Sequence, residues 1–164
     1  MDLALLLLRL LLSCMLIGHG LQKSVGLFHG MGLRSTAALF EQWGFRPGRQ
    51  LVVLASLCEV SAGALFLIGL ATPLASVIAI ATMTVASAPN LRNGFWAARG
   101  GWELSFVYAA LAVVLGFSGG GGLSIDRLLH VPNGWLVGLV VVVVGVLAAT
   151  PPLVVRSLKL RAEV

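Results

Sequence analysis

"LLLLRLLLSCML", residues 5–16, is apolar at every position except Arg9 and Ser13. With its neighbours it extends over residues 3–21, close to the 20 or so residues that a helix needs to cross a bilayer. The rest of the chain has a similar composition, since 59% of its 164 residues are hydrophobic and only 10% are charged. Soluble domains carry roughly 25% charged residues. The sequence therefore predicts an all-α integral membrane protein with one membrane domain, residues 1–164.

Four more apolar segments are long enough, or nearly so, to cross the bilayer. They cover residues 50–71, 73–90, 103–118 and 134–155. The second and third spans must form an antiparallel hairpin, because only a short turn before Pro73 separates them, and Pro73 suits the first turn of a helix. After the fourth span, the glycine-rich stretch GFSGGGGLS, residues 116–124, predicts a flexible outer loop.

Lysine and arginine are distributed unevenly over the loops that five crossings create. One side holds nine of these residues, and the other side holds only Arg127. The nine are Lys23, Arg34, Arg46, Arg49, Arg92, Arg99, Arg156, Lys159 and Arg161. Because basic residues favour the cytoplasmic side, the sequence predicts the N-terminus outside and the C-terminus in the cytoplasm. The same count favours the fifth crossing, since four crossings would place the basic C-terminal end outside.

The first loop contains STAALFEQWGF, residues 35–45, which begins with two good N-cap residues and continues with a mixture of aromatic and polar side chains. This pattern predicts a short interfacial helix over residues 35–45 on the cytoplasmic face, with Trp43 at the level of the lipid headgroups. An ordinary loop with aromatic anchors would give the same pattern.

Several classes of partner and ligand are disfavoured. The net charge of +5 does not indicate nucleic-acid binding, because the basic residues are spread through loops without interleaved aromatic residues. The bilayer is the partner that the composition predicts. His19, His29 and His130 lack the spacing of metal ligands, so we expect no metal site. Cys14 and Cys58 lie inside apolar segments and do not indicate a disulfide framework.

Two charges lie within the predicted spans, where an ionisable residue is unfavourable and often functional. Arg9 shares one helix face with Ser13, Gly20 and Lys23. Glu59 lies in a stripe of small residues, which predicts that it faces a neighbouring helix and not lipid. With a rise of about 1.5 Å per residue, Arg9 and Glu59 differ in depth by about 6 Å. The sequence therefore predicts a structural Arg9–Glu59 ion pair, with outward snorkelling of Arg9 as the alternative.

A second polar group gathers at the cytoplasmic ends of the first and fourth spans. His19, Gln22 and Lys23 end the first span, and Glu103 begins the fourth. Together with Glu59 they are the candidate ligand-binding residues, because they could bind the oxygens of a quinone and transfer a proton. A helix end with snorkelling polar side chains would explain the same residues.

The chain resembles the DoxX family in the order and spacing of several motifs over residues 5–130. These motifs are LLRLLLSCMLIGHGLQKSVG (7–26), FEQWGF (40–45), CEVSAGALFLIGLATPLA (58–75), PNLRNGFWAARGGWELSF (89–106) and LSIDRLL (123–129). The resemblance implies a small transmembrane bundle from bacterial or archaeal redox systems, with relatives among the subunits of thiosulfate:quinone oxidoreductase. The family's recurrent polar positions fall here on Arg9, His19, Gln22, Lys23, Glu59, Asn93 and Glu103, and its loop motif falls on Asn93, Gly94, Phe95 and Trp96. The family usually has four spans, and residues 134–155 add a fifth.

Two functions follow from this reading. The first is a redox-linked subunit in a bacterial cell membrane that binds a quinone near the cytoplasmic ends of spans one, two and four. Such a subunit would hold no cofactor of its own and would depend on a partner oxidoreductase, so catalysis by this chain alone stays open. The alternative is a non-catalytic scaffold that recruits soluble redox or stress-defence enzymes through loop 22–49. The oligomeric state also stays open, with a homo-oligomer as one option.

Overall fold

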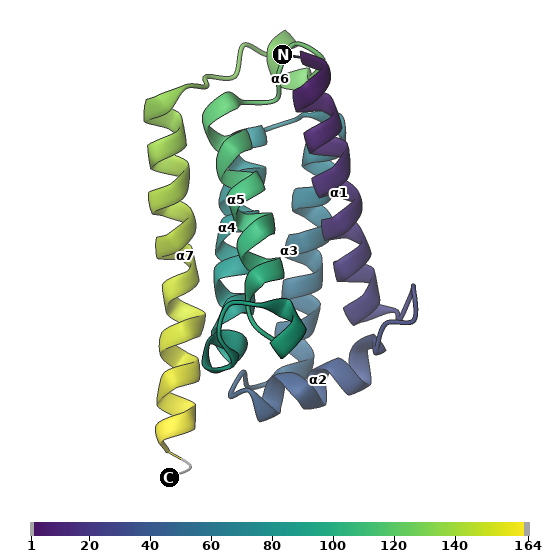
Figure 1. The fold of residues 1–164 in the computed structure, drawn as a ribbon, viewed down its shortest axis with the longest axis vertical. Coiled ribbons are helices and arrows are strands. Elements are labelled where there is room, and N and C mark those ends of the chain that lie inside the picture. The colour runs from purple at the N-terminus through teal and green to yellow at the C-terminus, as the bar shows by residue number, and fades with distance from the viewer. Residues whose placement is uncertain (1, 163–164) are drawn as a thin grey trace.

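The computed structural model describes residues 2–162, and in that part of the chain every regular element is a helix. Four helices form the bundle: α1 (Asp2–Ser24), α3 (Gly48–Ile68), α4 (Thr72–Ser87) and α5 (Glu103–Ser118). A fifth long helix, α7 (Trp135–Arg161), packs against α4 and α5 (Figure 1). The predicted all-α membrane bundle with an added C-terminal helix is therefore confirmed.

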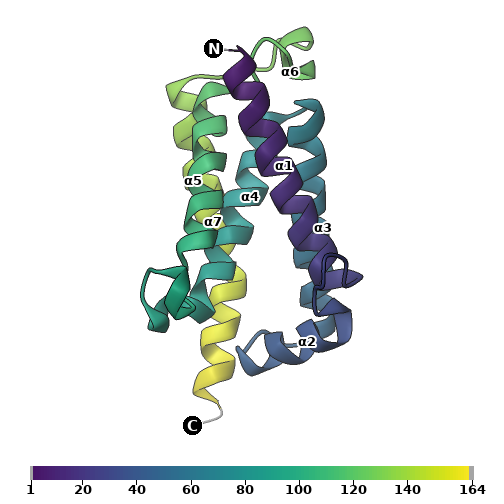
Figure 2. The same ribbon diagram turned by 45° about the vertical axis from the view of Figure 1, so that its right-hand side comes forward.

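Shorter helices complete the two ends of the bundle. At one end, called here the α2 end, α2 (Gly32–Gln42) lies across the bundle. The short helices η1 (Ala88–Asn93) and η2 (Ala97–Arg99) lie toward the same end, on the other side of α7 from α2 (Figure 2). At the other end, the N-terminal end, α6 (Ile125–Leu128) lies near the start of α1. The predicted short helix exists, but it begins at Gly32 and ends at Gln42. Ser35 and Thr36 therefore lie within it and do not cap it.

Length and composition make four helices candidates for membrane spans. These are α1, α3, α7 and the continuous stretch Thr72–Asn93 that α4 forms with η1. The fifth bundle helix, α5, is apolar but has only 16 residues. Its bounds agree with those predicted from the sequence, and its contacts with α4 place it inside the bundle.

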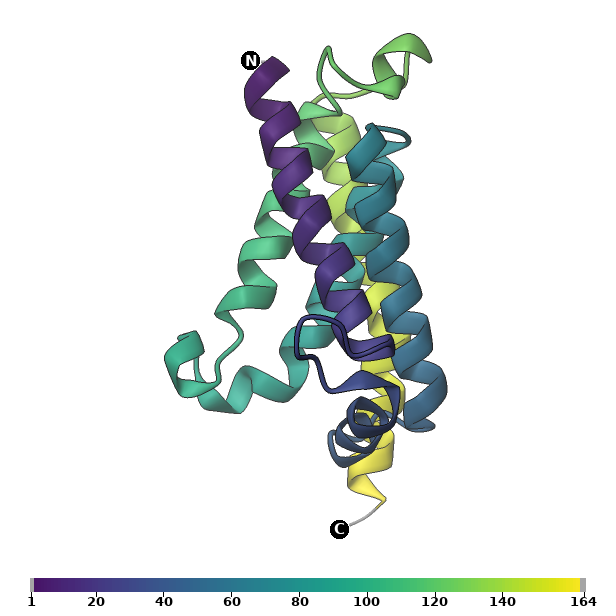
Figure 3. The same cartoon turned by 90° about the vertical axis from the view of Figure 1, so that its right-hand side faces the viewer.

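Close approach of α1 and α3 sets the frame of the bundle (Figure 3). A Cβ atom on Gly20 would lie 2.8 Å from Val60 Cγ2, and one on Gly63 would lie 2.7 Å from Ile17 Cγ1. Small residues allow transmembrane helices to pack this tightly. The prediction that the small residues around Glu59 face a neighbouring helix is therefore confirmed, and that neighbour is α1.

The glycine-rich loop between α5 and α6 is not the free linker that its composition predicts. Gly122 N donates to Asp2 Oδ1 at 2.8 Å, which binds the loop to the first turn of α1. Gly134 N donates to Phe117 O at 3.1 Å and closes the connection to α7. These bonds fix the loop over the N-terminal end of the bundle.

Candidate functional site

Arg9 does not pair with Glu59, so this prediction was wrong. Its side chain is 1% exposed and donates to four main-chain carbonyl oxygens. The acceptors are Phe66 O at 2.9 Å and Leu67 O at 3.3 Å on α3, and Gly120 O at 2.6 Å and Leu123 O at 2.9 Å in the glycine-rich loop. Backbone carbonyls are one of the partners that buried charges use in membranes. Arg9 therefore joins three segments at the N-terminal end.

The error lies in the register of the two helices. The contacts at Gly20 and Gly63 bring Gly20 level with Ser56 and Glu59, and bring Ser13 level with Gly63. Arg9 then lies beside Gly69, at the far end of α3. At about 1.5 Å per residue, this register separates Arg9 from Glu59 by about 12 Å along the helices, twice the predicted offset.

Asp126 is a buried carboxylate whose role the sequence did not reveal. Its side chain is 5% exposed and accepts hydrogen bonds from Ala71 N at 2.6 Å and Thr72 N at 2.7 Å. These are the free N–H groups at the start of α4, so Asp126 acts as an N-cap from a distant loop. A cap contributed from 54 residues away has no local sequence signal.

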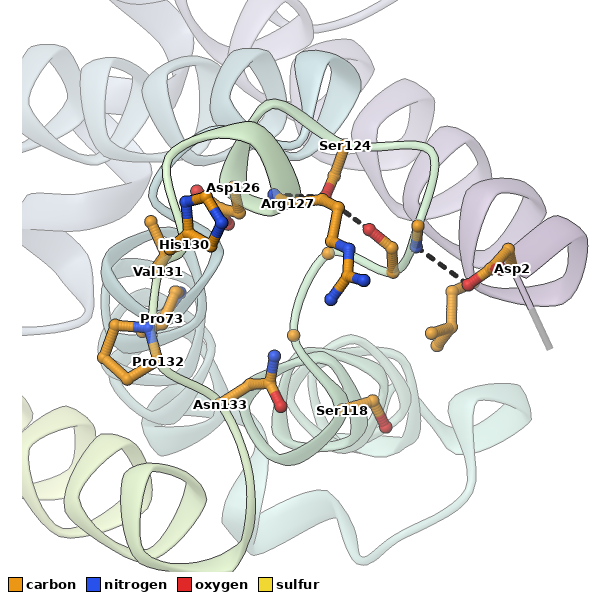
Figure 4. A pocket seen from close by; sticks show the side chains of 15 residues that line it. Asp2, Pro73, Ser118, Ser124, Asp126, Arg127, His130, Val131, Pro132 and Asn133 are labelled. Atoms are coloured by element: carbon orange, nitrogen blue, oxygen red, sulfur yellow. Dashed lines mark hydrogen bonds between the residues drawn. The ribbon is translucent and has the colours of Figure 1, made fainter.

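A polar cavity of about 640 Å³ opens beside this network at the N-terminal end. Figure 4 shows Asp2, Arg127, His130 and Asn133 around it, with Gly122 N bonded to Asp2. The carboxylates of Asp2 and Asp126 already accept main-chain N–H groups. The cavity is therefore bordered by groups that organise the loop.

Glu59 pairs with Lys23 at the other half of the bundle. The glutamate is 1% exposed, whereas the lysine is 22% exposed and reaches it from the last turn of α1. Glu59 Oε1 accepts from Lys23 Nζ, while Glu59 Oε2 is buried and has no hydrogen-bond partner in residues 2–162. One carboxylate oxygen thus keeps its capacity to accept a hydrogen bond.

The Lys23–Glu59 pair borders a second cavity, called here the inner cavity, of about 520 Å³. The inner cavity lies where α4 and α5 diverge from α1 and α3 toward the α2 end (Figure 3). Its lining consists of His19, Lys23, Phe40, Trp43, Phe45, Leu51, Leu54, Ala55, Cys58, Glu59, Ala81, Thr82, Met83, Val85, Ala86, Pro89, Asn90, Ala97, Gly101, Leu104, Ser105, Tyr108, Ala148 and Pro152. Most of these side chains are apolar, and the Lys23–Glu59 pair is the ion pair among them. Small-molecule sites commonly have this size and composition.

His19 and Tyr108 add two polar rings to the same wall. Their ring centroids lie 5.4 Å apart in an edge-to-face arrangement, which joins α1 to α5. His19, Lys23 and Glu59 are thus three of the five candidate ligand-binding residues that the structure brings together. Tyr108 was missed, because a single tyrosine in an apolar helix carries no recognisable pattern.

The other two candidate residues lie outside the lining of the inner cavity. Gln22 is on the last turns of α1 but does not border it. The Glu103 carboxylate instead accepts from Ala97 N at 2.8 Å. Its main-chain N–H donates to Phe95 O at 2.9 Å. Glu103 therefore fixes the loop that leads into α5, and its neighbours Gly101, Leu104 and Ser105 line the cavity instead.

The Asn-Gly-Phe-Trp loop folds back on itself. Asn93 Nδ2 donates to Gly100 O at 3.0 Å, and Gly94, with φ of 80°, turns the chain. Phe95 packs edge-to-face against Trp96, with a centroid distance of 5.2 Å, and also against Trp102 and Phe106. This aromatic cluster explains the spacing of the motif as a structural requirement.

Comparison with known proteins agrees with this architecture. A family model described as DoxX matches residues 4–89, and a model described as the TQO small subunit DoxD matches residues 48–148. No curated protein and no solved structure matches the chain. Each family match covers more than half of the 164 residues, and together the two include every residue that lines the inner cavity except Pro152 of α7. The chain therefore belongs to the DoxX family of multi-pass membrane proteins and is related to the small subunit DoxD of thiosulfate:quinone oxidoreductase.

Proposed function

We propose that this protein is the membrane subunit of a quinone-linked redox system and that it binds a quinone in the inner cavity. One observation carries the proposal: a buried carboxylate with an unpaired oxygen lies on the wall of a largely apolar cavity. A quinone head is a flat apolar ring with polar oxygens at its edge. The cavity offers apolar walls for the ring and a small polar group for the oxygens.

The polar side chains of the inner cavity differ in whether they can donate or accept a hydrogen bond. Lys23 and His19 have N–H groups that can donate to a quinone carbonyl oxygen. Glu59 Oε2 can accept from a hydroxyl group of the reduced carrier. Interconversion of a quinone and its reduced form moves two electrons and two protons, and the Glu59 carboxylate and the His19 imidazole are groups in the cavity lining that can hold a proton.

Electrons would come from a partner oxidoreductase, since the sequence holds no cofactor motif. The relation to the DoxD subunit supports such a complex. In this proposal the protein lies in a bacterial cell membrane with the α2 end and the C-terminus in the cytoplasm, as the basic residues predict.

The proposal is tested by the affinity of the purified protein for decylubiquinone, measured calorimetrically in nanodiscs. Glu59→Gln and His19→Ala should each weaken binding about tenfold, the effect expected from loss of a hydrogen bond to a charged or polar group. Glu41→Gln is the matched control, because Glu41 is exposed and lies outside the cavity. Unchanged affinity in both cavity variants would exclude this site.

A scaffold function has its own supporting observation. The loop between α1 and α2 exposes Val25 (66%), Phe28 (68%) and Met31 (58%). Replacing these three with serine should abolish capture of a partner enzyme and leave decylubiquinone affinity intact. Deleting residues 35–45 would not separate the two functions, because Phe40, Trp43 and Phe45 line the inner cavity.

A further inference from the structure

The fifth long helix, α7, contributes directly to the inner cavity. Ala148 and Pro152 of α7 belong to its lining, as does Glu59 of α3. Pro152 follows Pro151 inside the helix, where the missing N–H of proline disturbs the hydrogen-bond ladder. One turn beyond this point, α7 passes the loop that follows α2.

Arg156 connects α7 to that loop by two contacts. Its Nε donates to the main-chain oxygen of Trp43 at 2.8 Å. Its guanidinium carbon lies 5.4 Å from the centroid of the Phe45 ring, within the range of a cation–π interaction. Arg156 makes no ion pair within residues 2–162, so these contacts are the ones that orient its charged group.

The loop segment held by Arg156, residues 43–45, is also a wall of the inner cavity. Trp43 and Phe45 both belong to the lining, and Phe45 is 5% exposed. Phe40 packs on both rings, with centroid distances of 5.9 Å and 5.7 Å. Gly44, between Trp43 and Phe45 in the sequence, has φ of 85°. A Cβ atom on Gly44 would lie 2.7 Å from Leu160 Cγ of α7. The loop therefore fits closely against the last turns of α7.

From these contacts we infer that Arg156 is a positioning residue for the ligand site. It holds Trp43 and Phe45 in place, so that α7 closes the α2 end of the inner cavity and controls entry of a lipid-soluble carrier. The identity of the ligand rests on the proposed function, whereas the closure rests on the contacts of Arg156 alone.

Closure of the inner cavity can be tested without any ligand by the chemical reactivity of Cys58, which lies in the cavity lining. In a Cys14→Ser background, the rate of Cys58 modification by N-ethylmaleimide reports how often the cavity opens. Arg156→Ala should raise this rate about tenfold, because both the hydrogen bond and the cation–π contact are lost. Lys159→Ala is the matched control, since Lys159 is an exposed cation on the same helix. An equal rise in both variants, or none in Arg156→Ala, would overturn the inference.

Two further variants separate positioning from general destabilisation. Arg156→Lys keeps the charge and a donor for Trp43 O, so it should restore part of the protection. Phe45→Leu removes the ring and keeps apolar packing. Its effect should overlap with that of Arg156→Ala, and the double variant should modify Cys58 no faster than the faster single variant. Additive rates would mean that the two side chains act independently, contrary to the inference.

Decylubiquinone affinity provides the second readout and distinguishes the two proposals. If wild-type protein binds it, Arg156→Ala should weaken binding about tenfold at an unchanged melting temperature. If wild-type protein does not bind it, the proposed function fails, while the Cys58 rates still decide whether Arg156 closes the cavity.

Discussion

Arg9 shows how a membrane protein can bury a full positive charge without an ion pair. Its planar guanidinium group has donors that point in several directions, which suits carbonyl oxygens from different segments better than a lysine ammonium group would. Each of the four acceptors lies at a place where a helix ends or a loop turns. The charge is therefore satisfied by main-chain carbonyl groups in an apolar environment, and one of them, Phe66 O, also accepts from Gly69 N at 3.1 Å.

The first prediction follows from the separation of Arg9 and Glu59. In a double-mutant cycle, Arg9→Met and Glu59→Gln should have effects on the free energy of unfolding that add to within about 0.5 kcal/mol. The two side chains share no partner, because Arg9 binds carbonyl groups and Glu59 binds Lys23. Denaturant unfolding in detergent micelles measures the cycle. A coupling above about 1 kcal/mol would reinstate the Arg9–Glu59 pair.

The second prediction concerns the unequal burial of Lys23 and Glu59. Lys23→Met should lower the free energy of unfolding by about 2 kcal/mol more than Glu59→Gln does, because it leaves a fully buried carboxylate without its cation. In Glu59→Gln, the partly exposed lysine can extend toward water. Thermal unfolding of both variants in the same detergent measures the difference. Equal losses would mean that Glu59 finds another partner.

At the scale of elements, α4 depends on a cap from a distant loop, and this gives a third prediction. Asp126→Ala should cost about 1–2 kcal/mol of stability, because Ala71 N and Thr72 N lose their acceptors. Asp126→Asn retains one carbonyl oxygen and should cost less. Hydrogen exchange should speed up in residues 70–76 and remain unchanged in α7. Unchanged exchange in residues 70–76 would show that another group caps α4.

Local signals made most helix positions predictable from the sequence. The bounds of α5, Glu103–Ser118, agree with the predicted span because a loop of glycine and tryptophan precedes it and glycines follow it. The inner cavity was predictable in part, since His19 and Lys23 share the end of one apolar helix, and Glu59 is the only acidic residue in the middle of another.

What remained beyond the sequence depends on contacts between distant segments. The partner of Glu59 depends on the register of α1 and α3, which the contacts at Gly20 and Gly63 determine. A shift of four residues, about one helical turn, was sufficient to assign the wrong cation. The prediction of a flexible glycine-rich loop failed for a similar reason, because Arg9 donates to Gly120 O, which is 111 residues away in the sequence. Composition describes a free loop and contains no information on such an anchor.

At the scale of the whole molecule, α5 presents the main question of topology. Its 16 residues extend about 24 Å, less than the roughly 30 Å of a hydrocarbon core. An aromatic cluster of Phe95, Trp96 and Trp102 adjoins its first turn, at the depth where aromatic residues favour the interface. Local thinning of the bilayer can accommodate a short helix of this kind. We therefore expect α5 to cross.

The fourth prediction tests this crossing and the orientation together. In a chain without Cys14 and Cys58, single cysteines are placed at Ala98, Asn133 and Ala162, in the segments before α5, before α7 and after α7. An impermeant maleimide added to intact cells should label only position 133, and the other two should react only after the membrane is opened. The expectation rests on the basic residues, most of which lie toward the α2 end. At the N-terminal end of the described chain Arg127 is the only exposed cation, since Arg9 is buried there. Labelling of positions 98 and 133 from the same side would show that α5 does not cross. Labelling of positions 98 and 162 alone in intact cells would show the reverse orientation, with the inner cavity toward the outer face.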